Sequence, residues 1–110
     1  MGNWRVVYYN SKVEVKILAW PQKLLERYLR IVNLIESEGA NLRMPLARAL
    51  GDGLFEIRVK AKDGIGRAFF CYAVKQEVMV LHGFIKKTRE TPLKELKLAQ
   101  KRMREVKYAI

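Results

Sequence analysis

The sequence predicts an α+β fold, in which helices pack on a mostly antiparallel sheet. Apolar residues recur every three to four positions in two long segments and alternate with charged residues in a third, and turn signals separate the segments. At 110 residues the chain has room for one hydrophobic core, so we expect a single domain over residues 1–110. The expected element order is strand, two helices, three strands and a final helix, or β-α-α-β-β-β-α.

The first part of the chain is expected to form one strand and two helices. Residues 4–9 are rich in β-branched and aromatic side chains, which is typical of a strand. Ser11 and Glu14 match a capping box, which predicts a short helix with Ser11 as its N-cap. Pro21 suits the first turn of a second helix, and Gly39 is a natural stop. This second helix has the clearest apolar stripe in the chain, formed by Leu24, Leu25, Tyr28, Ile31, Val32 and Ile35.

The middle of the chain is expected to form an antiparallel meander. Residues 40–53 contain one proline and two glycines, which predicts an irregular connection. Over residues 54–60 apolar and charged side chains alternate, so one face of this strand should be buried and the other solvated. Asp63-Gly64 is a strong hairpin signal and leads into a strand over residues 66–74. A second turn joins this strand to the almost wholly apolar segment 78–85, which gives two hairpins in series.

The C-terminal segment is expected to form a basic amphipathic helix. Thr91 suits its N-cap position, and Pro92 suits its first helical position. One side of this helix is apolar, with Leu93, Leu96, Ala99, Met103 and Val106 at spacings of three and four. The other side carries Lys94, Lys97, Lys101, Arg102, Arg104 and Lys107.

The charge balance is unusual for a domain of this size. Twenty-two Lys and Arg against eleven Asp and Glu give a net charge of +11. Such self-repulsion opposes compaction, so a polyanionic partner is expected: nucleic acid, an anionic membrane or an acidic protein. A membrane fits least, because no apolar run reaches the roughly 18 residues of a spanning helix and the N-terminus lacks the apolar core of a signal peptide. The single Cys71 cannot form an internal disulfide, so we expect a cytoplasmic protein.

Few residues of the chain suit metal or nucleophilic chemistry. With one His and one Cys the sequence has no zinc-type ligand cluster, and no acidic spacing suits calcium or a magnesium pair. We therefore expect no metal and no cofactor. A Cys71–His82 nucleophilic pair is an alternative, but the apolar strand around Cys71 favours a core residue. His82 itself is either a packed core histidine or an acid–base group.

Charged residues are expected to gather on one face of the sheet. Glu56, Arg58 and Lys60 alternate along one strand, and side chains at every second position share a face. Arg67 opens the next strand, and Lys86-Lys87 close the last one. Converging cations can hold a phosphodiester and stabilise the additional negative charge of a phosphorane. The alternative is an ordinary half-buried strand whose charged face is solvated.

Three short motifs stand in series along the chain. They are Leu54-Phe55-Glu56-Ile57-Arg58, then Arg67 early in the next strand, then Leu81-His82-Gly83-Phe84-Ile85-Lys86-Lys87-Thr88 leading to Thr91-Pro92. In this order and spacing they resemble the phage-derived, HigB-like branch of the RelE/ParE toxin superfamily. The resemblance covers essentially the whole chain, and the expected element order is that of the family.

The resemblance implies the toxin of a type II toxin-antitoxin system. Such a toxin is a metal-independent endoribonuclease, or mRNA interferase, that cuts messenger RNA in the ribosomal A site. The ribose 2′-hydroxyl attacks the phosphodiester and leaves a 2′,3′-cyclic phosphate. The resemblance also implies a helix-turn-helix antitoxin as partner, with operator DNA bound only through that antitoxin.

By motif position, the resemblance implies roles for several residues. Arg67 would bind the scissile phosphate and stabilise the transition state, with Arg58 second. Glu56 would orient Arg58 or act as general base. Lys86 and Lys87 would position the phosphate or protonate the leaving 5′-oxygen. One further candidate catalytic residue and three candidate RNA contacts complete the set: His82, and Lys60, Phe84 and Arg89.

Two other functions fit the same fold. One is a ParE-like toxin that binds and poisons DNA gyrase without cutting RNA. The other is a catalytically inactive basic module that acts in DNA binding through its antitoxin. The co-occurrence of Glu56, Arg58, Arg67 and the Lys86-Lys87 pair favours the nuclease. For a nuclease, Arg67→Ala is expected to abolish toxicity while leaving the protein folded.

Overall fold

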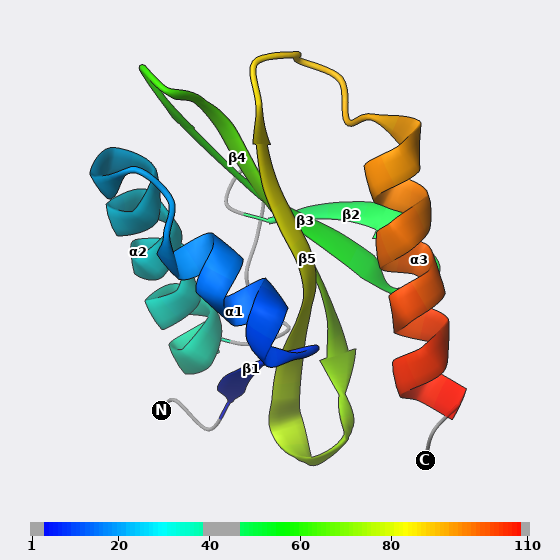
Figure 1. Ribbon diagram of the computed structural model, residues 1–110. Helices are drawn as coiled ribbons and strands as arrows, with labels where there is room; N and C mark the ends of the chain where they lie inside the picture. Colours follow the sequence, from blue (N-terminus) through cyan, green and yellow to red (C-terminus); the bar gives the residue numbers. More distant parts are fainter. Residues whose placement is uncertain (1–3, 39–46, 109–110) are drawn as a thin grey trace.

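The computed structural model describes residues 4–38 and 47–108, which form a five-stranded mixed sheet and three helices (Figure 1). The predicted α+β class and the predicted element order are confirmed, with one additional strand and a short 3-10 turn, η2. Along the chain the elements are β1 (Arg5–Tyr8), α1 (Ser11–Leu18), α2 (Gln22–Glu38), β2 (Arg48–Gly51), β3 (Leu54–Ala61), β4 (Gly64–Ala73), η2 (Val74–Gln76), β5 (Glu77–Lys86) and α3 (Leu93–Tyr108).

The sheet is built around the predicted meander. Its strand order is β1-β5-β4-β3-β2, and β3, β4 and β5 pair antiparallel in two successive hairpins. β1 pairs parallel with β5, with Arg5 opposite Glu77, so the first and last strands of the chain are neighbours. The sheet is mixed because β1 and β5 are parallel, whereas the other neighbouring strands, including β2 and β3, are antiparallel.

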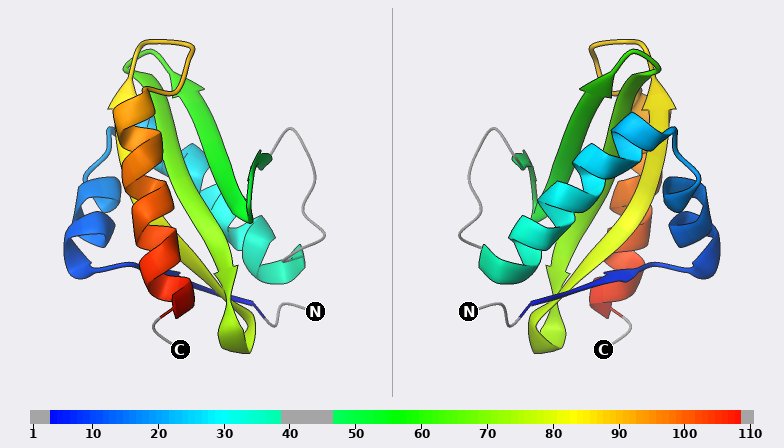
Figure 2. Two further views of the ribbon diagram at one scale, coloured as in Figure 1. Left: turned by 90° about the vertical axis from the view of Figure 1, so that its right-hand side faces the viewer. Right: turned by 90° about the vertical axis from the view of Figure 1, so that its left-hand side faces the viewer.

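The helices cover both faces of the sheet. α1 and α2 lie on one face and α3 lies on the other, as the views of Figures 1 and 2 show. Because side chains alternate along a strand, β3 sends Ile57 and Val59 into the core beneath α1 and α2, whereas Leu54 joins the core beneath α3. Glu56 therefore also points to the α3 side. No helix in the described part of the chain is long and apolar enough to cross a membrane.

Both predicted helix caps are shifted by one residue. Asn10 is the N-cap of α1, because its side-chain Oδ1 accepts a hydrogen bond from the Val13 amide at 2.9 Å. The prediction of a capping box with Ser11 as N-cap is therefore wrong, and Ser11 is the first helical residue. Before α3, the carbonyl of Pro92 accepts from the amide of Leu96 at 3.1 Å, so Pro92 precedes the helix instead of opening it. Thr91 is not the cap, since its hydroxyl bonds Glu56 on β3.

The irregular connection predicted over residues 40–53 is wrong at its C-terminal end. Arg48 and Ala49 pair with Glu56 and Phe55 of β3, so residues 48–51 form the edge strand β2. Three consecutive residues with positive φ close this hairpin: Gly51 at 102°, Asp52 at 55° and Gly53 at 89°. These glycines thus mark a tight turn between two strands. The stop at Gly39 and the rest of the connection up to residue 46 lie outside the described residues.

Gly83 on β5 permits a close approach between α1 and the sheet. A Cβ at this position would lie 2.5 Å from both Cγ1 and Cδ1 of the buried Ile17. Gly83→Ala is therefore expected to lower the free energy of unfolding by about 1–3 kcal/mol through overpacking. Urea unfolding of this variant, with and without Ile17→Ala, measures the effect. An equally large loss in the Ile17→Ala background would contradict the explanation, because that background lacks the clashing atoms.

Candidate functional site

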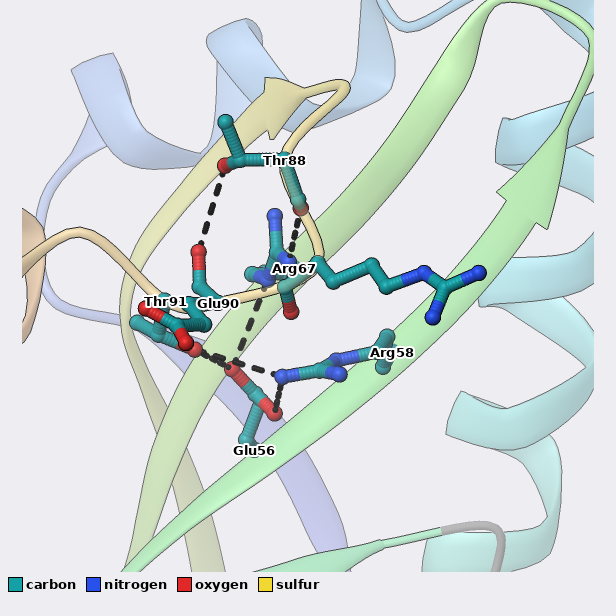
Figure 3. Close-up of polar contacts among 7 residues, drawn as sticks. Glu56, Arg58, Arg67, Thr88, Glu90 and Thr91 are labelled. Carbon is teal, nitrogen blue, oxygen red and sulfur yellow. Dashed lines mark hydrogen bonds and ion pairs between the residues drawn. The ribbon is translucent and has the colours of Figure 1, made fainter.

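The pairing of β3 with β4 brings two arginines to one carboxylate. Arg58 lies directly opposite Arg67, and Glu56 lies two positions before Arg58 on the same face. Figure 3 shows contacts from both arginine side chains to the Glu56 carboxylate, from the end of the Arg58 guanidinium and from the Nε side of Arg67. Arg58 Nη2 is 3.1 Å from Glu56 Oε1, and Arg67 Nε is 3.8 Å from Glu56 Oε2. The structure therefore brings together three of the predicted site residues as one cluster.

The connection between β5 and α3 covers this cluster. Arg67 Nη2 donates to the backbone carbonyls of Thr88 at 2.5 Å and Arg89 at 2.8 Å. Thr91 Oγ1 donates to Glu56 Oε2 at 2.8 Å and accepts from Arg58 Nη2 at 3.3 Å (Figure 3). As a result Arg67 is 0% exposed and Glu56 is 1% exposed. Thr91 is thus a residue of the site. Its position just before a helix predicts an N-cap instead, so sequence reasoning misses its role.

The cluster carries more positive than negative charge. Arg58 and Arg67 share the single carboxylate of Glu56, and Nε and Nη1 of Arg67 have no hydrogen-bond partner. Burial lowers the pKa of the Arg67 guanidinium and the charge of Arg58 lowers it further, whereas Glu56 raises it. Because an arginine in a protein stays protonated, one positive charge of the cluster is not neutralised by Glu56. Such a charge favours an anion at the nearest surface.

Arg58 connects the buried cluster to the surface. A quarter of its side chain is exposed, and it borders a groove of about 310 Å³. The groove is lined by Arg48, Leu50, Arg58, Arg89, Glu90 and Thr91. The candidate RNA contact Arg89 thus lies beside Arg58. Arg48 comes from β2, and sequence reasoning misses it because residues 40–53 are predicted to be an irregular connection. Three arginines in one groove can bind a phosphate group.

Phe84 lies beneath this site and is not exposed to it. Only 3% of its surface is accessible. The Arg67 Cζ atom lies 5.9 Å from the centre of its ring, and the His82 ring stacks on it with the ring centres 5.5 Å apart. Both contacts are with protein groups, so in this conformation Phe84 offers no free face to an RNA base.

The remaining candidates lie toward α1 and the start of α3. His82 is buried, and its Nε2 forms a 2.8 Å hydrogen bond with Glu95 Oε1. Burial acts to raise the pKa of Glu95, but the hydrogen bond and charge of His82, together with the charges of Lys16 and Lys86, lower it. The charge of Lys86 therefore affects the pKa of Glu95 in the His82–Glu95 pair. Lys87 is exposed, just after the end of β5. None of His82, Lys86 and Lys87 has a described contact with Glu56, Arg58 or Arg67.

The burial of His82 predicts a loss of stability in mild acid. Burial is the largest effect and lowers its pKa below the ordinary 6.5, and Glu95 only partly offsets this. The unfolded chain then binds a proton more readily than the folded one, so stability falls as the pH drops below 6.5 toward the lower folded pKa. Urea unfolding at about pH 7.5 and 5.5 should show a larger fall for the parent than for His82→Gln. Equal falls would contradict this assignment, since the chain has one histidine.

Cys71 is a core residue. It lies opposite Met79 in the sheet and is fully buried with Leu54 and Phe69 on the α3 side. Burial raises the pKa of its thiol, so the reactive thiolate is disfavoured. No contact joins Cys71 to His82 in the described part of the chain. Over residues 4–38 and 47–108, no group of three or more His, Cys, Asp or Glu residues could hold a metal ion.

Comparison with known proteins identifies the family. A search of curated proteins finds no match. Among solved structures, one chain in the crystal structure of the archaeal RelE-RelB complex from Pyrococcus horikoshii OT3 matches with a TM-score of 0.55. The match has 17% sequence identity and covers 80% of this chain and 99% of that chain, so it shows a RelE-like fold. The family model described as "Phage derived protein Gp49-like (DUF891)" matches residues 16–104. The protein therefore belongs to the phage-derived Gp49-like family of RelE/HigB-like toxins.

Proposed function

We propose that this toxin is an endoribonuclease whose groove at Arg58 binds the scissile phosphodiester of mRNA. The observation that carries the proposal is the arrangement of Arg58 and Arg67 around the single carboxylate of Glu56. The excess positive charge of this cluster meets the surface at Arg58, in the groove that Arg48 and Arg89 also line. A phosphodiester carries the complementary charge, and guanidinium groups bind phosphate oxygens in pairs of parallel hydrogen bonds.

The proposed reaction uses a nucleophile that the substrate supplies. The ribose 2′-oxygen bonds to the adjacent phosphorus and loses its proton, while the bond from phosphorus to the 5′-oxygen breaks and that oxygen gains a proton. The products are a 2′,3′-cyclic phosphate and a free 5′-hydroxyl. Arg48, Arg58 and Arg89 would contact the phosphorane, and Arg67 would stabilise its charge from beneath. The proposed reaction needs no metal and no cofactor, because the 2′-hydroxyl is the nucleophile.

We assign the remaining roles from the contacts that the candidate acid–base groups make. Glu56 is engaged by Thr91, Arg58 and Arg67, so we assign it the positioning of Arg58. His82 is engaged by Glu95 and holds the start of α3 against the sheet. The exposed Lys86 and Lys87 stand at the end of β5, next to the connection that covers the site. We assign these lysines to phosphate positioning and to protonation of the 5′-oxygen.

The proposed partners are messenger RNA in the ribosomal A site and a helix-turn-helix antitoxin. The matched structure with this fold is part of a RelE-RelB complex, which supports an antitoxin partner here. A net charge of +11 suits both a polyanionic RNA and an acidic protein. In this proposal the toxin acts in the cytoplasm and reaches operator DNA only through the antitoxin.

The experiment that tests the reaction uses a single substituted nucleotide. Purified toxin is mixed with ribosomes that carry a short mRNA, and the major cleavage position is located. The same mRNA with a 2′-deoxyribose before the scissile phosphate should resist cleavage at that position, whereas the unmodified mRNA should give a 2′,3′-cyclic phosphate end. Cleavage of the deoxy-substituted bond would exclude attack by the 2′-hydroxyl. Translation arrest without cleavage of either mRNA would exclude the nuclease.

A further inference from the structure

Arg58 borders a second groove as well as the first. This second groove, of about 370 Å³, lies where α2 packs against β3. It is lined by Arg27, Arg30, Ile31, Arg58, Val59 and Lys60. The first groove, lined by Arg48 and Arg89, meets it at Arg58, since this side chain belongs to both linings. We call the two grooves together the track; its lining residues come from β2, β3, α2 and the connection before α3.

The track is strongly cationic and contains little negative charge. Besides Arg58 it presents five exposed cations, and the only acidic residue in either lining is Glu90. In the described part of the chain none of these five cations forms an ion pair. The five are Arg27, Arg30, Arg48, Lys60 and Arg89. Cations without ion-pair partners produce a positive potential that a polyanionic strand would neutralise along its length.

The α2 part of the track is built on regular secondary structure. Arg27 and Arg30 come from α2, and Arg27 Nη1 donates to the backbone carbonyl of Lys60 on β3. This bond ties the helix to the strand at the groove and holds one guanidinium in place. Neither groove lining contains an aromatic side chain, so base stacking has no platform there. The side chains that line the grooves therefore suit the phosphates of a nucleic acid strand and not its bases.

We propose that a single strand of RNA crosses Arg58 and places phosphates in both grooves. Arg27, Arg30 and Lys60 hold the segment next to the scissile phosphate, which lies in the groove with Arg48 and Arg89. This proposal rests on the proposed nuclease function and names the path of its substrate. Contacts with phosphates would make this segment tolerant of base sequence.

The salt dependence of RNA binding tests the track directly. The probe is a single-stranded 2′-O-methyl oligoribonucleotide, which cannot be cleaved by 2′-hydroxyl attack. For single strands, the slope of the logarithm of affinity against that of salt concentration changes by about 0.7 for each phosphate neutralised. The double variant Arg27→Gln/Arg30→Gln should therefore bind with a slope about 1.4 smaller in magnitude than the parent. The control Lys23→Gln/Lys97→Gln removes equal charge from exposed positions outside both grooves and should keep the parent slope.

Each outcome of this experiment decides the proposal. The proposal is overturned if the Arg27/Arg30 variant keeps the parent's salt-dependence slope, or if the control loses as much slope as this variant. A loss of binding to poly-glutamate with unchanged RNA binding would identify a protein-binding surface and would also overturn it. Circular dichroism checks folding, and Arg30→Gln alone, which keeps the Arg27 bond to β3, should lower the slope by about 0.7. Cleavage of ribosome-bound mRNA by the parent, measured in parallel, tests the nuclease function separately.

Discussion

Replacing Arg58 by Gln is expected to lower the rate of RNA cleavage by about 100- to 1,000-fold, as is usual when one group that stabilises transition-state charge is removed. Arg58 is the side chain that joins the buried cluster to both grooves. The fold should survive, because Glu56 keeps its contacts with Arg67 and Thr91. We expect the free energy of unfolding to fall by about 1–2 kcal/mol, the usual effect of losing one hydrogen-bonding partner.

Single-turnover cleavage of ribosome-bound mRNA measures this effect, together with thermal unfolding. Arg104→Gln is the matched control, because Arg104 is an exposed residue of α3 outside both grooves and carries the same charge. The control should cleave at close to the parent rate. Parent-like cleavage by a folded Arg58→Gln variant would remove the groove from the reaction.

Replacing Arg67 by Met is expected to lower the free energy of unfolding by about 3–5 kcal/mol, because it breaks a buried ion pair from one side. Arg67 is 0% exposed, and its loss leaves the carbonyls of Thr88 and Arg89 without their donor. A domain of this size is stable by only about 5–15 kcal/mol in total. The burial of Arg67 thus changes the expectation from the sequence that Arg67→Ala would leave the protein folded.

A double-mutant cycle separates the ion pair from general packing. Urea unfolding is measured for Arg67→Met, Glu56→Gln and the double variant. Arg67→Met leaves the buried charge of Glu56 with fewer partners, and Glu56→Gln removes that charge. The double variant should therefore lose less stability than the sum of the two single losses, by about 0.5–3 kcal/mol. Strict additivity would contradict a direct interaction between Glu56 and Arg67.

The strands that carry the site could be predicted from the sequence. Alternation places Glu56 and Arg58 on one face of β3, and Asp63-Gly64 indicates a tight turn between β3 and β4. These two relations are local, so periodicity and turn chemistry predict them. The register is different: a turn centred on Asp63-Gly64 would set Lys60 opposite Arg67, whereas Ala61 pairs with Gly64 and the turn residues are Lys62 and Asp63, which sets Arg58 opposite Arg67.

The burial of the cluster could not be predicted in the same way. Alternation shows that Glu56 and Arg58 share a face, but not that the connection from β5 to α3 lies over that face. The hydroxyl of Thr91 bonds the buried carboxylate of Glu56 in place of capping α3, and that choice depends on a contact 35 residues away along the chain. The pairing of β2 with β3, which brings Arg48 to the groove, is also set by tertiary structure.

The separation of the candidates on β5 depends on lateral position in the sheet. The sequence predicts that Lys86 and His82 converge with the arginines, since all lie on strands of one meander. The pairing of β4 with β5 is regular from Lys86 to His82 and sets Phe84 opposite Arg67, so His82 lies two residues away and meets Glu95 of α3. Glu95 is 13 residues further along the chain, so the pattern of β5 alone does not identify it as the partner of His82.

Mapping RNA ends in cells determines whether this toxin cuts messenger RNA, as we propose. The protein is induced in bacteria without an antitoxin, and new 5′ ends are located across the transcriptome. We predict cuts confined to translated frames, with codon periodicity, and their loss on induction of the Arg58→Gln variant. Growth arrest with intact messages would contradict the proposed nuclease function and would favour a toxin that stalls gyrase on DNA.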